Sequence, residues 1–243
     1  MIKFFRKIRQ NLLMENKTGK YFKYAIGEIV LVVIGILIAL QINNWNENKK
    51  SRRFEVKILK ELRNDLKSNY LELAEIRENY EVLIIKSDSL IDVLKNQNFD
   101  LTIHSNLLRG LDYGNFGVYN VSSTTYKFIE SKGFELLTND SLRISISDIY
   151  ERRIFNIVNN HKRYRSFYEE ETRPYLSSRF LLPKFGVPIP LNKASVENQT
   201  FKNLVNRRSR LLEVTKRNTQ GCLDDMDILI QRIDQEIMKN DIK

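Results

Sequence analysis

The sequence predicts an all-α protein in which one N-terminal transmembrane helix precedes an elongated antiparallel bundle of three long helices with short helices between them. Three observations support this fold class. The chain of 243 residues holds only 9 Gly and 4 Pro, which favours long helices over β-sandwiches or disordered tails. An apolar run lies near the N-terminus. Three later segments carry apolar residues at helical spacing.

We expect three parts along the chain: residues 1–23 as a cytoplasmic basic amphipathic segment, residues 24–45 as a transmembrane helix, and residues 46–243 as a periplasmic helical bundle domain. In the first part, apolar and basic side chains fall on opposite sides of a helix: Ile2, Phe5, Ile8 and Leu12 against Lys3, Lys7 and Arg9. Such a helix suits the inner membrane surface. A solvated tail is the alternative.

The run "YAIGEIVLVVIGILIALQINNW", residues 24–45, predicts the membrane span. Ten Val, Leu or Ile residues lie within residues 29–40, and each contributes about −0.3 to −0.6 kcal/mol to insertion. About 20 weakly polar residues reach across a hydrocarbon core of roughly 30 Å. Tyr24 and Trp45 are the aromatic residues expected at the two membrane interfaces, and Glu28 lies near the headgroup boundary.

Two alternatives remain open for this run. A cleaved signal peptide would have a short basic segment before it and a small-x-small site after it, whereas Leu40-Gln41-Ile42-Asn43 follows the run here. A core helix of a soluble protein is the second alternative, which the basic and aromatic residues on both sides of the run disfavour.

Most of the formal charge of +10 lies near the apolar run, because residues 1–53 account for +8 of it. Basic residues that flank an apolar span contact lipid headgroups, each worth about 1 kcal/mol near an anionic surface. The basic N-terminal segment predicts a single-pass membrane protein with its N-terminus in the cytoplasm. We expect no nucleic-acid partner, since the chain has neither a reading motif nor a basic stripe on a folded face.

Small residues recur at helical spacing within the run, at Gly27, Gly35 and Ala39. A stripe of small residues lets another transmembrane helix approach closely. The sequence thus indicates a possible helix–helix contact, with a lipid-facing stripe as the alternative.

The first 47 residues, "MIKFFRKIRQNLLMENKTGKYFKYAIGEIVLVVIGILIALQINNWNE", closely resemble the N-terminus of an uncharacterised family of single-pass membrane proteins from Bacteroidota, known as a domain of unknown function. A looser resemblance covers "SSTTYKFIESKGFELLTNDSLRISISDIYE", where Lys132 separates the Ser131 and Gly133 of the family's Ser-Gly turn. The resemblance implies a bitopic inner-membrane protein with a helical periplasmic domain. It implies no catalytic residues.

A first long helix is predicted from about Arg52 to Asn96, rising about 65 Å. Its seven-residue repeat is a coiled-coil seam, and further apolar residues widen the stripe enough to contact two partner helices in a bundle. Only two seam positions are polar, Asn69 and Ser87. The full seam comprises Leu59, Leu62, Leu66, Asn69, Leu73, Ile76, Tyr80, Leu83, Ser87, Leu90 and Leu94.

After a glycine-containing break, a short helix capped by Ser123 or Thr124 is predicted to end near Gly133. Asn139 reads as the N-cap of a second long helix that ends at about Arg173 and runs back towards the membrane. A Pro-rich loop, residues 175–195, comes next. A third helix follows it and spans residues 201–237. We expect the two irregular loops at opposite ends of the bundle, with the Pro-rich loop near the membrane.

Candidate catalytic, cofactor and metal residues are missing from the sequence. His104 and His161 have no ligand partner at a suitable spacing, and no phosphate-binding loop or nucleophile elbow is present. We therefore expect no enzyme activity, cofactor or metal. Tyr113, Phe116 and Tyr119 lie among glycines and form a possible partner-binding loop, although a loop that packs its own aromatics over the bundle is the alternative.

These observations predict a non-enzymatic, membrane-anchored interaction or scaffold protein. Its expected partners are the lipid bilayer and either another protein or a second copy of the chain. The alternative is a sensor-like outer domain that binds a small ligand and signals through a membrane partner.

Overall fold

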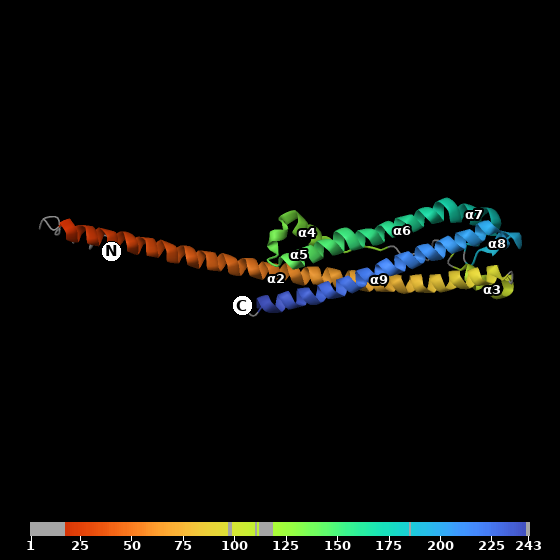
Figure 1. The fold of residues 1–243 in the computed structure, drawn as a ribbon, viewed down its shortest axis with the longest axis horizontal. Helices are drawn as coiled ribbons and strands as arrows, with labels where there is room; N and C mark the ends of the chain where they lie inside the picture. Colours follow the sequence, from red (N-terminus) through yellow and green to blue (C-terminus); the bar gives the residue numbers. More distant parts are fainter. Residues whose placement is uncertain (1–17, 97–98, 110, 112–118, 185, 242–243) are drawn as a thin grey trace. The chain divides into compact units, whose positions relative to one another are not determined.

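The computed structural model describes residues 18–96, 99–109, 111, 119–184 and 186–241, and it confirms the all-α fold. The chain divides into two compact units, one up to Phe54 and one from Glu55 to Lys243. The elements (Figure 1) are α2 Thr18–Lys95, α3 Leu101–Leu108, α4 Thr124–Lys132, η2 Phe134–Leu136, α5 Asp140–Ser147, η3 Asp148–Ile154, α6 Phe155–Phe167, η4 Tyr168–Thr172, α7 Arg173–Arg179, β1 Phe180–Leu181, β2 Ile189–Pro190, α8 Ala194–Glu197 and α9 Gln199–Asp241.

In the second unit, the heptad seam of α2 is the core of the bundle. All eleven predicted seam positions are buried. They pack against both the α5–α7 region and α9, since Leu62 shares a cluster with Ile146 and Met226. The width of the apolar stripe therefore predicted its two neighbours correctly.

The helical rod from α5 to α7 runs in the same direction as α2, which corrects the expectation that it returns towards the membrane (Figure 1). Near the start of α5, the Thr138 backbone N–H donates to Glu55 Oε1 at 2.7 Å. At the other end, Leu176 and Phe180 pack in one cluster with Leu94. Only α9 runs antiparallel to the other two rods.

Residues 119–123, directly before α4, lie along α2 without forming a helix. The Asn69 side chain binds the main chain of Ser122 through both its amide groups, with Nδ2–O and Oδ1–N distances of 2.8 Å. The Asn120 N–H donates to Glu72 Oε1 at 2.8 Å. Asn69 is only 1% exposed. Its polar side chain thus supplies hydrogen-bond partners for the Ser122 N–H and C=O inside the core.

The second long helix, formed by α5 to α7 and called the second rod here, is longer than expected and continues past Pro174 to Arg179. It contains two π-helical stretches, η3 and η4, and Pro174 occupies the first turn of α7 directly after η4. The residue before it, Arg173, donates its N–H to the Tyr168 carbonyl five residues back, so Pro174, which has no N–H, follows a widened turn of a continuous helix. At its beginning, Asn139 Oδ1 accepts from the Leu142 N–H, which confirms the predicted N-cap.

The Pro-rich loop lies at the same end of the second unit as α3, which belongs to the first irregular segment, and this is a second correction. Phe180 of the Pro-rich loop and Val196 directly after it pack in one cluster with Leu108 of α3 and Leu94 of α2. The loop therefore lies at the far end of the second unit from Glu55. The expected membrane contact assumed that the loop lies at the other end of the bundle, and that assumption is wrong. It forms a short hairpin in which Leu181 pairs with Ile189; neither this hairpin nor α3 was predicted.

The short helix was predicted correctly, and it is α4. It follows Ser123, whose side chain makes no capping hydrogen bond, and it ends at Gly133 with a φ of 104°. A left-handed φ of this kind favours glycine. The third helix is also continuous through Gly221, as predicted.

Candidate functional site

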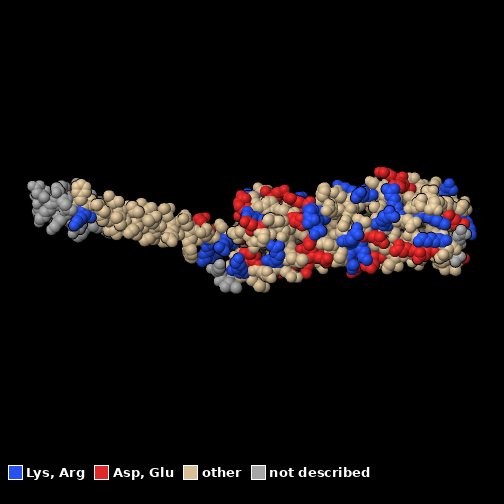
Figure 2. Space-filling model, in the orientation of Figure 1, with Lys and Arg blue, Asp and Glu red and all other residues tan. Residues whose placement is uncertain are grey.

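Within the described part of the chain, α2 is the helix that is long and apolar enough to cross a membrane. Its apolar stretch begins at Ala25, reaches a mean hydropathy of 2.6 and has none of its 18-residue window buried. Charged side chains of both signs cover the second unit, while the visible surface of the apolar stretch is free of them (Figure 2). The stretch is thus not a core helix of this structure.

The predicted interface residues all lie in α2. Trp45 is exposed, and Lys49 Nζ lies 4.9 Å from the centre of its ring. An aromatic ring with a neighbouring cation is typical of a membrane–water boundary. Glu28 is half-buried. These positions are compatible with the predicted interfaces, whose membrane role stays a prediction.

Gly27, Gly35 and Ala39 are exposed. A Cβ added to either glycine would have no atom within 4 Å. Packing within this chain therefore does not require small residues at these positions, and the predicted helix–helix contact stays a prediction.

Tyr113 and Phe116 of the predicted partner loop lie outside the described residues. Tyr119 is described, and it packs against the hydrophobic core on two sides. Burial raises the pKa of its phenol well above the ordinary value. Tyr119 therefore packs over the bundle, which was the alternative to a partner-binding role.

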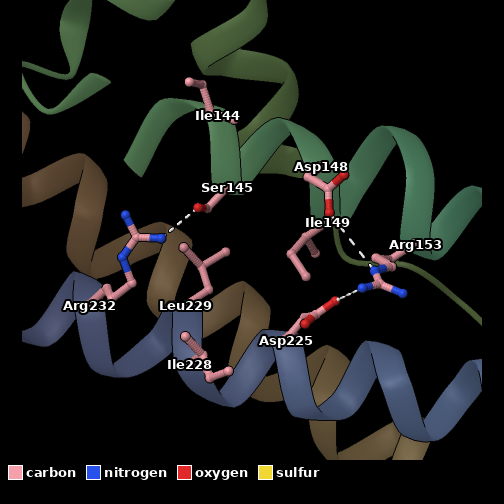
Figure 3. A pocket seen from close by; sticks show the side chains of 9 residues that line it. All are labelled: Ile144, Ser145, Asp148, Ile149, Arg153, Asp225, Ile228, Leu229 and Arg232. Atoms are coloured by element: carbon pink, nitrogen blue, oxygen red, sulfur yellow. Dashed lines mark hydrogen bonds and ion pairs between the residues drawn. The ribbon is translucent and has the colours of Figure 1, made fainter. Parts of the chain in front are cut away.

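A groove of about 390 Å³ lies on the second unit, between the α5–η3 region and α9 (Figure 3). Two helices supply its walls, and side chains one turn apart on each helix point into it. Its lining comprises Ile144, Ser145, Asp148, Ile149, Arg153, Asp225, Ile228, Leu229 and Arg232.

One end of the groove is an ion-pair cluster around Arg153. The Arg153 guanidinium pairs with Asp225 of α9 and lies 3.9 Å from Asp148. Arg152 also donates to Asp148, with an Nη2–Oδ2 distance of 2.7 Å. The Arg152 hydrogen bond holds the pKa of the Asp148 carboxyl below its usual range. Asp225 thus takes part in a contact between helices.

The other end of the groove holds Arg232, whose guanidinium donates to two serine hydroxyls. The Nη1–Oγ distance to Ser145 is 2.6 Å, and the Nη2–Oγ distance to Ser141 is 2.8 Å. Among the described residues, no carboxylate makes an ion pair with Arg232. Between the two ends stand Ile144 and Ile228, which are 71% and 54% exposed.

Sequence reasoning missed this groove because its residues come from two distant segments. Each segment carried a signal, however. Ile144 and Ile228 are aliphatic residues that lie off the buried stripes of their helices, where a solvent-facing position favours a polar residue. The exposed aliphatics could have been found from the helical phase, but their meeting across two helices could not.

The two histidines are bound by neighbours. His161 Nε2 forms a hydrogen bond with the Tyr80 hydroxyl, and His104 Nδ1 accepts from the Asp100 N–H at 3.0 Å. In the described ranges, no cluster of three or more His, Cys, Asp or Glu residues is placed to hold a metal ion. Cys222 is buried, and burial raises the pKa of its thiol to about 12.

A family of unknown function (DUF6090) matches this chain over residues 28–206. The matched range includes most of the apolar stretch, the α5–η3 wall of the groove and the start of α9. No curated protein and no solved structure matches.

Proposed function

Because the chain belongs to the DUF6090 family, whose function is unknown, we propose a function from its own structure: a non-enzymatic, membrane-anchored interaction or scaffold protein. The observation that carries this proposal is the apolar stretch of α2, which has no buried residue in its 18-residue window. Exposed aliphatic area of this size is unfavourable in water, at about 25 cal/mol per Å². Lipid is the environment that suits it.

The proposed location is the inner membrane, crossed once, with the N-terminus in the cytoplasm and the helical unit in the periplasm. The support is the distribution of Lys and Arg around the span and the resemblance to Bacteroidota membrane proteins. A long C-terminal domain is translocated largely regardless of its charge, so Lys49 and Lys50 are compatible with this orientation.

An interaction role is favoured over the small-ligand sensor by the form of the groove. Binding sites for small molecules typically bury about 70–90% of the ligand's surface. The groove walls at Ile144 and Ile228 are largely open. A macromolecular surface would cover these side chains better than a small ligand would.

Fractionation of cells that express the full chain tests the anchor. We expect the intact chain in the membrane pellet after alkaline carbonate washing. Protease added to spheroplasts should digest the helical unit and leave the N-terminal segment protected. Recovery of the chain in the soluble fraction, or of a chain without its first fifty residues, would contradict the proposal.

A further inference from the structure

We propose that the groove between α5–η3 and α9 is a docking site for an amphipathic helix of a partner protein, which places a carboxylate against Arg232 and aliphatic side chains between Ile144 and Ile228. This inference rests on the proposed interaction function, since it requires a protein partner. It adds the site and the chemistry of the segment that the site recognises.

The charges of the groove are unevenly compensated. At one end, Arg153 is paired with two carboxylates, those of Asp148 and Asp225. At the other end, Arg232 has only the hydroxyls of Ser141 and Ser145 as partners among the described residues. The uncompensated positive charge of the groove is therefore at Arg232, and an anionic group is its complement.

The geometry of Arg232 suits a carboxylate. A guanidinium has five N–H donors, and the two serines accept from two of them. The remaining donors are available to an incoming acceptor, and the serines hold the planar group in place. Hydrogen bonds between arginine and a carboxylate are about twice as strong as neutral ones. Arg232 is thus a pre-positioned cation beside an apolar surface.

The shape and the apolar walls of the groove select a helix as the occupant. Two helices lying side by side form a trough whose ridges pack with the side chains of a third. Ile144 and Ile228 stand on opposite walls (Figure 3), with Ile149 and Leu229 buried between them. Amphipathic helices bind such troughs with aliphatic residues at positions i, i+3, i+4 and i+7. The occupant would extend the three long rods of the unit to a four-helix arrangement.

Photo-crosslinking from inside the groove tests the proposal in the full chain, expressed in its own cells. A photoreactive amino acid replaces Ile228, and adducts are mapped by mass spectrometry. We expect an adduct to a protein segment with helically spaced aliphatic residues and an Asp or Glu. Arg232→Glu should lower its yield about tenfold, which corresponds to about 1.4 kcal/mol. Arg210→Glu, which changes an exposed arginine of α9 outside the groove, should leave it unchanged.

A charge exchange makes the test specific. Reversing the partner's acidic residue to Arg should restore the adduct to the Arg232→Glu chain. Arg232→Lys keeps the charge but not the planar fork, so we expect an intermediate yield. Helical circular dichroism of each purified variant checks that the bundle is folded.

Several outcomes would overturn the inference: no adduct, an adduct only to lipid or to a second copy, or a protein adduct that is unchanged in folded Arg232→Glu and Arg232→Lys chains. These outcomes can be told apart from failure of the proposed anchor. A chain that stays in the carbonate-washed pellet without a protein adduct retains its anchor and loses the docking site. A soluble chain loses the anchor whatever the groove binds.

Discussion

Two stretches of the same helix, α2, carry similar aliphatic residues but place them in different surroundings. In the first unit, residues 29–40 are apolar on every side of the helix and exposed. In the second unit, Leu59 to Leu94 are apolar along one stripe, and that stripe is buried. A stripe can be covered by two neighbouring helices, whereas a helix that is apolar all round needs an apolar surrounding on all sides. The pattern, more than the residue types, distinguishes a span from a core helix.

The strongest test of this difference is charge placed in the middle of the span. Ile34→Arg with Leu37→Arg adds two buried charges to a membrane helix, at a cost of about 2.5–3.5 kcal/mol each. We expect the double variant to lose the carbonate-resistant membrane fraction.

Its matched control is Leu71→Arg, since Leu71 is 70% exposed on α2 in the second unit. This variant should remain in the membrane pellet. Equal fractionation of the two variants would mean that the apolar stretch does not hold the chain in lipid.

A smaller effect is expected from removing a side chain of the buried stripe. Leu62→Ala leaves a cavity beside Ile146 and Met226, and such changes usually cost about 2–5 kcal/mol. Chemical unfolding followed by circular dichroism should show this loss in the free energy of unfolding. Leu71→Ala, at an exposed position of the same helix, should change it by less than about 0.5 kcal/mol.

The polar position within the stripe should have a moderate effect. Asn69→Ala removes both hydrogen bonds to Ser122 and leaves buried main-chain groups without partners. The expected cost is about 1–3 kcal/mol for each unsatisfied group. Asn69→Leu would fit a regular seam better, so an increase in stability with Leu would contradict the role assigned to Asn69. Unfolding curves of both variants decide this.

The smallest predicted effect is a pH dependence of the bundle from His161. Burial lowers the pKa of His161 below its ordinary value of 6.5. The unfolded chain therefore binds a proton more readily than the folded chain, and stability must fall as the pH drops below 6.5 towards the folded pKa. We expect His161→Gln to reduce this dependence between pH 6.5 and about 5, as the titration range of histidine implies. If the stability of the His161→Gln variant depended on pH as that of the unchanged chain does, this role of His161 would be contradicted.

The sequence predicted the elements better than their arrangement. Local rules were sufficient for the seam of α2, the N-cap at Asn139 and the uninterrupted α9, because each depends on residues close along the chain. The direction of the α5–α7 helix follows from where the chain before α4 lies, and Ser122 there is bound by Asn69, 53 residues earlier in the chain. An asparagine in a seam indicates a buried polar partner, but its position alone does not identify that partner.

The π-helical stretches before Pro174 and the groove at Arg232 were beyond sequence reasoning for related reasons. A proline normally predicts a helix end, and the π turn that accommodates it here has no simple residue signature. Arg232 differs from other arginines of α9 by its hydrogen bonds to Ser141 and Ser145 of α5. Both features arise only when the rods pack together.

Trp45 is the only tryptophan of the chain, so its fluorescence in lipid vesicles tests the central claim directly. The full chain is reconstituted into vesicles whose acyl chains carry bromine at defined depths. With Trp45 at the membrane interface, emission should be blue-shifted relative to water and quenched most by bromine close to the headgroups. A Trp45→Phe, Leu71→Trp chain should remain unquenched. Water-like, unquenched emission from Trp45 would contradict the assignment of the apolar stretch of α2 as a membrane span.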